Sequence, residues 1–321
     1  MQNRFNVVMT APQLAAPAAR LLEEAGCAVH YMPPYPSAEA VAELTRAVAA
    51  DAILCRQGRV TGAVMDASPK LRIVARHGVG MDEVDVAEAA RRGLLVTRAP
   101  GSNTHAVAEH TLALVLALVK GLKPFGTVVA EGGWRGAAAQ VRDVAGLRLG
   151  LVGFGAIGQA VARLALAFDM RVAAYDPAVS DATFTSATRA ASLSELAAAS
   201  DVLSLHCPLL PETRHLVDGA VLAALPPGAF VVNTARGGLI DERALLDALD
   251  SGQVAGAGLD VFEEEPPAPG YRLRHHPAVV VTPHIAGVTE GSLVSMGVMA
   301  AECIVAALTG GTVPPERIVC G

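Results

Sequence analysis

Apolar and polar residues follow one another in short blocks that predict strands and helices in turn. In the first hundred residues, short apolar runs predict strands at 6–9, 28–31, 52–55, 73–76 and 94–97. Apolar residues at helical spacing predict helices at 14–25, 38–49 and 86–91. Strands that alternate with helices in this way build a parallel sheet covered by helices.

A second alternation begins near Gly146. It predicts strands at 148–152, 171–175, 202–205, 230–233, 255–259 and 279–282, and a last helix at about 290–308. Between the two alternations, 99–103 reads as a link, and the apolar pattern of 104–123 predicts one buried helix between two domains. We therefore predict an α/β chain with two Rossmann-like domains and doubly wound parallel sheets. One domain comprises 1–99 plus 288–321, and the other comprises 100–287.

Composition narrows the class of protein. A net charge of −6 over 321 residues, with no block of Lys and Arg, argues against nucleic-acid binding. The longest apolar run, 112–119, is too short for a bilayer, and the N-terminus lacks the pattern of a signal peptide. Five scattered cysteines without a C-x-x-C pair indicate reduced thiols, and no histidine spacing suits zinc. We expect a cytoplasmic protein with neither metal nor membrane partner.

A glycine motif follows the strand at 148–152. Its spacing is G-x-G-x-x-G, a helix pattern comes after it, and an acidic residue closes the next strand. Such glycines permit a tight turn, close approach of a pyrophosphate and close helix packing, and the helix N-terminus attracts the phosphates. A carboxylate at this distance accepts from ribose hydroxyls and repels a 2′-phosphate, which favours NAD over NADP. The predicted cofactor-binding residues here are Gly153, Gly155, Ala156, Ile157, Gly158 and Asp176.

Three polar residues stand just beyond apolar strands. They are Arg236, Glu265 and His284. Strand ends on one side of a parallel sheet converge, so the three side chains can share a cleft. A guanidinium grips carboxylate and carbonyl oxygens, a histidine exchanges a hydroxyl proton, and a carboxylate orients the histidine. Taken singly, each has a structural alternative: a surface ion pair, a solvated acidic loop or a structural histidine.

Three segments in this order resemble the D-isomer-specific 2-hydroxyacid dehydrogenases, a family that includes 3-phosphoglycerate dehydrogenase and hydroxypyruvate and glyoxylate reductases. They are Asn233-Thr234-Ala235-Arg236-Gly237-Gly238-Leu239-Ile240-Asp241-Glu242, Thr282-Pro283-His284-Ile285-Ala286-Gly287, and His206-Cys207-Pro208-Leu209 with Thr213. The resemblance covers about 51–309. It implies an NAD-dependent oxidoreductase acting on CH-OH donors, with a flavodoxin-like substrate domain.

The resemblance also implies residue roles. Arg236 binds substrate oxygens, His284 is the general acid/base, and Glu265 holds its imidazole. Asp260 accepts from the nicotinamide carboxamide. Further implied cofactor contacts are His206, Pro208, Thr213, Thr234, Ala235 and Gly287. The implied substrate-binding residues are Val79 and Gly80, through their backbone amides, and Asn103, for which a helix cap is the alternative. Trp134 lies in a stretch that forms a dimer contact in the family, with a buried anchor within one subunit as the alternative.

Two departures from the family pattern bear on the substrate. Glu83 stands where the family often has Asn, and Gln57 interrupts the sequence typical of phosphoglycerate dehydrogenases. Arg56 and Arg59 are candidates to bind a substrate phosphate or second carboxylate, and for Arg59 an arginine exposed beside a turn is the alternative. We expect a homodimer that acts on a small 2-hydroxy or 2-keto acid. The sequence leaves open the identity of the substrate, the physiological direction of the reaction and the strictness of the preference for NAD over NADP. Two alternative functions also stay open, which are a phosphite-type dehydrogenase and a non-catalytic, NAD-sensing corepressor-like protein.

Overall fold

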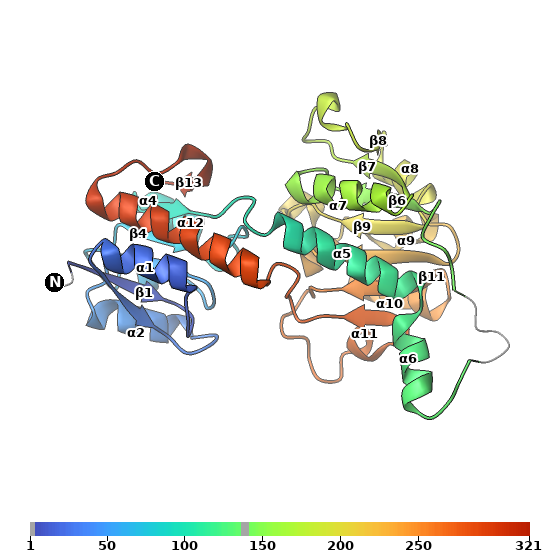
Figure 1. Cartoon of the computed structure of the whole chain (residues 1–321), viewed down its shortest axis with the longest axis horizontal. Helices are drawn as coiled ribbons and strands as arrows, with labels where there is room; N and C mark the ends of the chain where they lie inside the picture. Colours follow the sequence, from blue (N-terminus) through green and yellow to red (C-terminus); the bar gives the residue numbers. More distant parts are fainter. Residues whose placement is uncertain (1–3, 136–140) are drawn as a thin grey trace. The chain divides into compact units, whose positions relative to one another are not determined.

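The structure, a computed structural model, describes residues 4–135 and 141–321, and its contacts divide the chain into two units (Figure 1). Unit 1 comprises Met1–Asn103 and Val288–Gly321, and unit 2 comprises Thr104–Gly287. The chain therefore passes from one unit to the other at 103/104 and at 287/288. The sequence analysis places these crossings at 99/100 and 287/288. The assignment of one domain to the substrate and the other to NAD stays a prediction.

Unit 1 is built on a six-stranded sheet. Its parallel strands, in spatial order, are β2 (Cys27–Tyr31), β1 (Phe5–Met9), β3 (Ala52–Cys55), β4 (Ile73–Arg76) and β5 (Leu95–Thr97). This order, 2-1-3-4-5, is that of the flavodoxin-like sheet. The sixth strand, β13 (Ile318–Cys320), pairs antiparallel with β5 and was not predicted from the sequence. The predicted fold class is confirmed for this unit.

Helices cover both faces of the unit 1 sheet. The helix α1 (Ala16–Glu24) packs against α12 (Glu290–Thr309), and α12 also contacts β4 (Figure 1). A second apolar cluster lies with the remaining helices, which are α2 (Ala38–Ala47), α3 (Gly62–Met65) and α4 (Val86–Arg91). The helix α12 is long and apolar enough to cross a membrane, as is the bent pair formed by the helices at 104–119 and 122–130. Because α12 buries Met296, Ala300 and Ile304 in the unit 1 core, its apolar character is that of a core helix.

Unit 2 is built on a seven-stranded parallel sheet. Its strands, in spatial order, are β12 (Val279–Val281), β11 (Val254–Leu259), β10 (Ala229–Asn233), β9 (Val202–Leu205), β6 (Arg148–Val152), β7 (Arg171–Tyr175) and β8 (Thr188–Arg189). The order reverses between β6 and β9, as in the Rossmann fold. Ligands of such sheets bind at this switch point, beyond the carboxyl ends of the strands.

Two apolar clusters hold the helices of unit 2 to its sheet. On one face lie α5 (Thr104–Val119) and α7 (Ala156–Ala167), which pack against each other (Figure 1). The other cluster contains residues of α8 (Leu193–Ala198), α9 (Gly219–Ala224), α10 (Glu242–Asp250) and α11 (Arg272–His275). The glycines Gly256 and Gly258 of β11 allow α5 close to the sheet, since a Cβ at Gly258 would lie 3.0 Å from Leu114 Cβ.

The prediction of one buried helix over 104–123 was wrong. The helix α5 ends at Val119, Gly121 takes a left-handed conformation with φ of 60°, and α6 (Leu122–Ala130) leaves at an angle of 61°. None of the residues of α6 is buried. Both helices are rich in apolar residues, so the apolar pattern continues through the break. The apolar side chains of α5 face the core, whereas those of α6 face outward. Periodicity alone does not separate these two cases.

Candidate active site

Every residue predicted for the cofactor and for catalysis in unit 2, apart from Thr213, lies at or just beyond the carboxyl end of a strand, or on the helix that follows it. The glycine loop follows β6, His206 follows β9, Thr234 to Arg236 follow β10, and Asp260 follows β11. His284 comes three residues after the end of β12. The topology therefore brings these segments to the edge of the sheet where a ligand is expected.

The glycine loop has the shape that a pyrophosphate requires. A Cβ at Gly153 would lie 2.7 Å from the amide nitrogen of Cys207, and one at Gly158 would lie 2.4 Å from the carbonyl oxygen of Gly153. By contrast, a Cβ at Gly155 would meet no atom within 4 Å. Gly155 is the N-cap of α7, so the open side of the loop is also the positive end of that helix. The residues present fit NAD.

Asp176 is fixed beside this loop. Its Oδ2 accepts a hydrogen bond from the Phe154 amide at 2.8 Å, and its Oδ1 accepts one from the Ala178 amide at 2.9 Å. Each oxygen keeps a further lone pair. The carboxylate can therefore accept hydrogen bonds from ribose hydroxyls without losing the two contacts that orient it.

The remaining predicted cofactor contacts lie in loops held by hydrogen bonds. His206 Nε2 lies 2.9 Å from Ser204 Oγ, and burial lowers the pKa of His206 to about 3, so its ring is neutral. The Thr213 hydroxyl donates to the carbonyl oxygen of Pro208 at 2.8 Å and closes the loop after β9. The hydroxyl of Thr234 lies 2.9 Å from that of Thr111 on α5.

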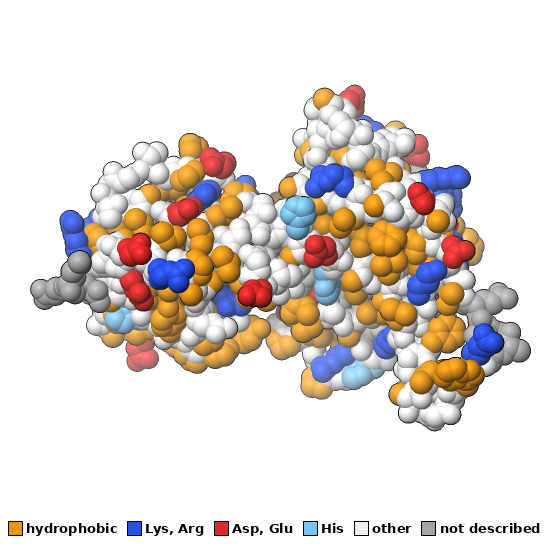
Figure 2. Space-filling model, in the orientation of Figure 1, with side chains coloured by type: hydrophobic (Ala, Val, Ile, Leu, Met, Phe, Trp, Pro, Cys, Tyr) orange, Lys and Arg blue, Asp and Glu red, His pale blue; other side chains and the backbone are white. Residues whose placement is uncertain are grey.

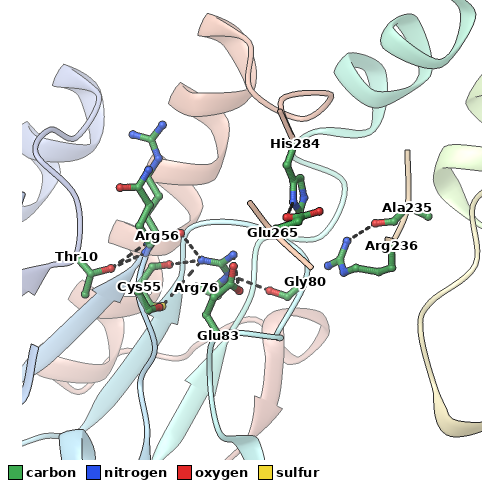
Figure 3. Close-up of polar contacts among 12 residues, drawn as sticks. Thr10, Cys55, Arg56, Arg76, Gly80, Glu83, Ala235, Arg236, Glu265 and His284 are labelled. Carbon is green, nitrogen blue, oxygen red and sulfur yellow. Dashed lines mark hydrogen bonds and ion pairs between the residues drawn. The ribbon is translucent and has the colours of Figure 1, made fainter. Parts of the chain in front are cut away.

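His284 and Glu265 form a hydrogen-bonded pair (Figure 3). Nδ1 of His284 donates to Oε2 of Glu265 at 2.6 Å, which leaves Nε2 for the proton exchanged with a substrate. This hydrogen bond raises the pKa of His284 above its ordinary value, against the effects of partial burial and of the Arg236 charge. Burial alone would raise the pKa of Glu265, but the hydrogen bond and charge of His284 outweigh burial, so the pKa of Glu265 is lowered.

His284 sits in a turn that Asp260 holds. The φ of His284 is 54°, a left-handed conformation that is rare for a residue with a Cβ. The His284 amide donates to the backbone oxygen of Asp260 at 2.8 Å, and the buried Asp260 carboxylate accepts from the amides of Ile285 at 2.9 Å and Ala286 at 2.8 Å. The Thr282 hydroxyl donates to the same carboxylate at 2.6 Å. These contacts hold the backbone turn from which the His284 ring reaches Glu265.

Sequence reasoning missed a further member of this network, His110. Its Nε2 lies 2.9 Å from Thr282 Oγ1. Because the Thr282 proton goes to Asp260, the Thr282 oxygen accepts and His110 Nε2 donates. His110 lies on α5, far from Thr282 in the sequence. The only signal in the sequence is a histidine within an apolar helix pattern.

Arg236 leaves β10 through a turn braced by Asn233. The buried Asn233 side chain accepts from the Ala235 amide at 3.0 Å and donates to the Arg236 carbonyl at 2.8 Å. Arg236 Nη1 donates to the Ala235 carbonyl at 2.7 Å (Figure 3). The charge of Arg236 acts on the pKa of both Glu265 and His284, so the three predicted catalytic side chains share one electrostatic environment.

A second buried carboxylate, that of Glu242, supports the loop that carries Glu265. Glu242 Oε1 accepts from the Glu263 amide at 2.8 Å, and its Oε2 accepts from the hydroxyl of Tyr271. Glu265 itself accepts from the Phe262 amide at 3.0 Å. Burial raises the pKa of Glu242, which these hydrogen bonds partly offset. The sequence contains Glu242 within a recognised motif but gave it no role.

The predicted substrate-binding residues other than Arg236 and His284 lie in unit 1. Arg56 follows β3, and Val79 and Gly80 follow β4. Asn103 directly precedes α5, at the crossing between the units. The hydroxyl of the buried Thr10, after β1, accepts from the Arg56 amide at 2.9 Å and thereby shapes the turn after β3. Sequence reasoning missed this contact because the threonine lies forty-six positions from its partner.

Two other expectations concern side chains outside the site. The interpretation of Trp134 as a buried anchor within one subunit was wrong, since 77% of its surface is exposed. Among residues 4–135 and 141–321, no group of three or more His, Cys, Asp or Glu side chains is placed to hold a metal ion.

Comparisons with known proteins agree with the resemblance predicted from the sequence. Residues 112–286 match the model of the NAD-binding domain of D-isomer-specific 2-hydroxyacid dehydrogenases. The chain is 44% identical over 269 residues to D-3-phosphoglycerate dehydrogenase of Mycobacterium bovis, a match that covers 83% of this chain and 50% of that protein. It is 40% identical over 248 residues to hydroxypyruvate reductase of Thermotoga maritima, covering 77% and 80%.

The structure agrees as well. A solved structure of a Thermus thermophilus protein is 36% identical and superposes with a TM-score of 0.90 over 98% of this chain and 99% of that one. The chain spans about half the length of the phosphoglycerate dehydrogenases that it matches, but most of the length of the hydroxypyruvate reductase. The chain belongs to the D-isomer-specific 2-hydroxyacid dehydrogenase family, and its cofactor is NAD(H).

Proposed function

We propose that the protein is an NAD-dependent D-2-hydroxyacid dehydrogenase that works as a 2-keto acid reductase of the phosphoglycerate, hydroxypyruvate or glyoxylate type. The observation that carries the proposal is the Glu265–His284 hydrogen bond of 2.6 Å within the electrostatic reach of Arg236. These are the groups needed to bind a keto acid and to protonate its oxygen. Unit 2 binds the cofactor, and unit 1 supplies the remaining substrate contacts.

The catalytic residues have distinct tasks in this proposal. Bound NADH supplies the hydride. Protonated His284 gives its Nε2 proton to the keto oxygen, and Glu265 keeps the ring oriented and stabilises its charge. The Arg236 guanidinium binds the substrate carboxylate and offsets the charge that develops on the oxygen. Glu265, His284 and Arg236 are therefore the proposed catalytic residues.

Binding residues follow the same division. The glycine loop with Ala156 and Ile157 holds the pyrophosphate, and Asp176 holds the ribose. Asp260, besides orienting the His284 turn, receives the nicotinamide carboxamide. The other proposed cofactor contacts are His206, Pro208, Thr213, Thr234, Ala235 and Gly287. The proposed substrate contacts are Arg56, Asn103 and the amides of Val79 and Gly80.

We also propose a cytoplasmic homodimer. The relatives are named as enzymes of metabolism, which supports the first part. The exposed apolar side chains of α6 support the second. Figure 2 shows hydrophobic side chains on the surface of unit 2 where Figure 1 places α6.

The test is NADH oxidation by the purified protein with glyoxylate, hydroxypyruvate, pyruvate, phenylpyruvate, 2-oxoglutarate and 3-phosphohydroxypyruvate, each repeated with NADPH. We expect turnover of at least one keto acid with NADH. In the His284→Ala variant, turnover should fall by about 100- to 10,000-fold while the dissociation constant of NADH stays unchanged.

Other outcomes point elsewhere. Undiminished turnover in the His284→Ala variant would contradict the role of His284. No turnover of any keto acid by a wild type that binds NADH would overturn the proposal. NAD⁺ reduction with phosphite would then indicate a phosphite-type enzyme, and a protein partner whose binding depends on NAD would indicate a corepressor-like protein.

A further inference from the structure

The helix α5 lies against the three strands of unit 2 that lead to the proposed catalytic residues. It contacts β10, β11 and β12, which are neighbours in the sheet. Two adjacent residues of α5, His110 and Thr111, form hydrogen bonds to residues just beyond β12 and β10. One helix therefore reaches the loops on both sides of Asp260, which directly follows β11.

His110 sets the direction of the hydrogen bond made by Thr282. The Thr282 hydroxyl donates to Oδ1 of Asp260 at 2.6 Å, and its oxygen accepts from Nε2 of His110 at 2.9 Å. His110 Nε2 itself lies 3.7 Å from that carboxylate oxygen, too far for a hydrogen bond, so His110 acts through Thr282. With a hydrogen from His110 on the Thr282 oxygen, the hydroxyl hydrogen of Thr282 stays directed at Asp260.

The Asp260 carboxylate keeps a single lone pair for a ligand. A carboxylate offers about four acceptor positions. Oδ1 accepts from the Thr282 hydroxyl and the Ile285 amide, and Oδ2 accepts from the Ala286 amide, with no further donor in the described part of the chain. Because this carboxylate is buried, a ligand donor at the remaining lone pair forms a charge-assisted hydrogen bond with little competition from water.

Thr111 makes Thr234 an acceptor in the same way. The Thr111 hydroxyl donates to the Val107 carbonyl one turn earlier in α5, at 2.8 Å. Its oxygen therefore accepts from the Thr234 hydroxyl, at 2.9 Å. Both threonines are buried, so water does not replace this contact. The hydroxyl hydrogen of Thr234 is thereby used, and only its lone pairs remain for a ligand.

We propose that His110 and Thr111 position the nicotinamide ring, because they leave only hydrogen-bond acceptors on the side chains of Thr234 and Asp260. Such a pair binds a donor, which is the NH2 group of the carboxamide or a hydroxyl of the adjoining ribose, and it disfavours the carboxamide oxygen. This inference rests on the proposed function, which assigns Thr234 and Asp260 to the cofactor. It adds two positioning residues that act without touching the cofactor themselves.

The dissociation constants of three nucleotides test this role in the full-length protein without substrate. They are those of NADH, of reduced 3-acetylpyridine adenine dinucleotide, whose methyl ketone has no N–H donor, and of ADP-ribose, which lacks the nicotinamide. Isothermal titration calorimetry measures all three. We expect the wild type to bind NADH about tenfold more tightly than the acetylpyridine nucleotide, because the ketone leaves the Asp260 lone pair without a donor. Equal affinities would overturn the inference.

His110→Leu removes the donor to Thr282 and keeps a side chain of similar size on α5. The Thr282 hydroxyl is then free to turn away from Asp260, so the dissociation constant of NADH should rise by about three- to tenfold. That of the acetylpyridine nucleotide should rise less, and that of ADP-ribose should not change. His110→Gln, which keeps an N–H donor, should recover most of the NADH affinity. The matched control is His105→Leu, an exposed position on the same helix, which should change none of the three constants.

Thr111→Val tests the second contact. It removes the acceptor for the Thr234 hydrogen and keeps the shape of the side chain, so the dissociation constant of NADH should rise by about three- to tenfold. Thr111→Ser keeps the hydroxyl and should bind NADH nearly as tightly as the wild type. Thr309→Val is the matched control, because Thr309 on α12 makes the same hydrogen bond to a carbonyl four residues earlier and lies in unit 1. It should leave NADH binding unchanged.

A double variant tests whether His110 acts through Thr282. Thr282→Val removes the donor to Asp260, so His110→Leu added to it should raise the dissociation constant of NADH by less than about twofold more. Additive effects of the two changes would overturn the proposed series of contacts. Independent structural damage would give such additive effects.

The remaining outcomes distinguish this inference from the proposed function. Equal weakening of all three nucleotides in His110→Leu would overturn the inference, since a general change of the fold would explain it. Unchanged NADH binding in both His110→Leu and Thr111→Val, in an active enzyme, would overturn the inference and leave the reductase proposal intact. A wild type that binds NADH but reduces no keto acid would overturn the reductase proposal, and the three dissociation constants would still decide the inference.

Discussion

His284 and Glu265 form the contact on which the proposed chemistry depends. The carboxylate raises the pKa of the imidazole, so more of His284 carries the proton that reduction requires at neutral pH. The raised pKa also links His284 to stability. Protonated His284 contributes to stability below its unfolded pKa, and this contribution is lost as pH rises through the folded value. Because half of the His284 side chain is exposed, water screens this contribution.

Replacement of Glu265 by Gln should shift the pH profile of keto acid reduction. The amide keeps a hydrogen-bond acceptor but removes the negative charge, so the pKa of His284 should fall. In the reduction direction, kcat/KM decreases as His284 loses its proton, so this decrease should begin at a lower pH in the variant. Above the pKa of His284, kcat/KM should fall roughly tenfold per pH unit. The oxidation of the hydroxy acid needs neutral His284, so its rising limb should move in the same direction.

The pH dependence of kcat/KM in both directions tests this expectation. Glu263→Gln is the matched control, since Glu263 is a nearby carboxylate that pairs with His215 and Arg214 and not with His284. An unshifted profile in Glu265→Gln, or an equal shift in the control, would contradict the assigned role of Glu265.

At the scale of elements, the loops beyond β10 and β11 support each other by close backbone contact. A Cβ at Gly237 would lie 1.8 Å from the carbonyl carbon of Phe262, and the amide of Phe262 binds Glu265. The first loop carries Arg236 and the second carries Glu265. Gly237 therefore lets two segments that are distant in sequence, each carrying a proposed catalytic residue, lie side by side.

Gly237→Ala should displace the loop of Glu265 and reduce activity and stability together. We expect the free energy of unfolding to fall by about 1–3 kcal/mol, as in other overpacked sites, and kcat/KM to fall at least about tenfold. Chemical denaturation and steady-state kinetics measure the two effects. At the control position Gly219, where a Cβ would lie 3.8 Å from Ala244 Cβ, alanine should change stability by less than about 1 kcal/mol. Full activity in Gly237→Ala would contradict the proposed dependence.

At the scale of the whole molecule, the chain forms two units with different sheet orders and exposes the apolar side of α6. Leu122, Val129 and Trp134 have 61%, 54% and 77% of their surface exposed. Apolar side chains that gather in this way on a surface mark a contact with another protein. A second copy of the chain is the partner that we propose.

Val129→Asp should convert the dimer to a monomer at protein concentrations at which the wild type is dimeric, because a carboxylate in an apolar interface loses its hydration without gaining a partner. Size-exclusion chromatography with light scattering measures the mass. Leu166→Asp is the control, since Leu166 is an exposed leucine on α7, with 45% of its surface exposed. A monomeric wild type, or a Val129→Asp variant that stays dimeric, would contradict a dimer formed through α6.

The family relationship and most core strands were predictable from the sequence. The edge strand β13 and the break between α5 and α6 were not. Strands such as β3, β4 and β9 are buried on both faces, so their apolar runs mark their bounds. The short strand β13 pairs antiparallel at a sheet edge, where burial is one-sided and the pattern is weak. The break between α5 and α6 was missed because the residues on both sides of it are apolar.

By itself, the sequence determined most core strands, the glycine loop with Asp176, and the order of Arg236, Glu265 and His284 at strand ends. These features depend on local patterns and on motifs of adjacent residues. Only the tertiary structure decided that Asp260, Thr282 and His110 hold His284 in a left-handed turn. Those contacts join residues that are far apart in the sequence. They form only where the folded backbone brings a donor close to an acceptor, and the spacing of residues along the chain does not give that distance in space.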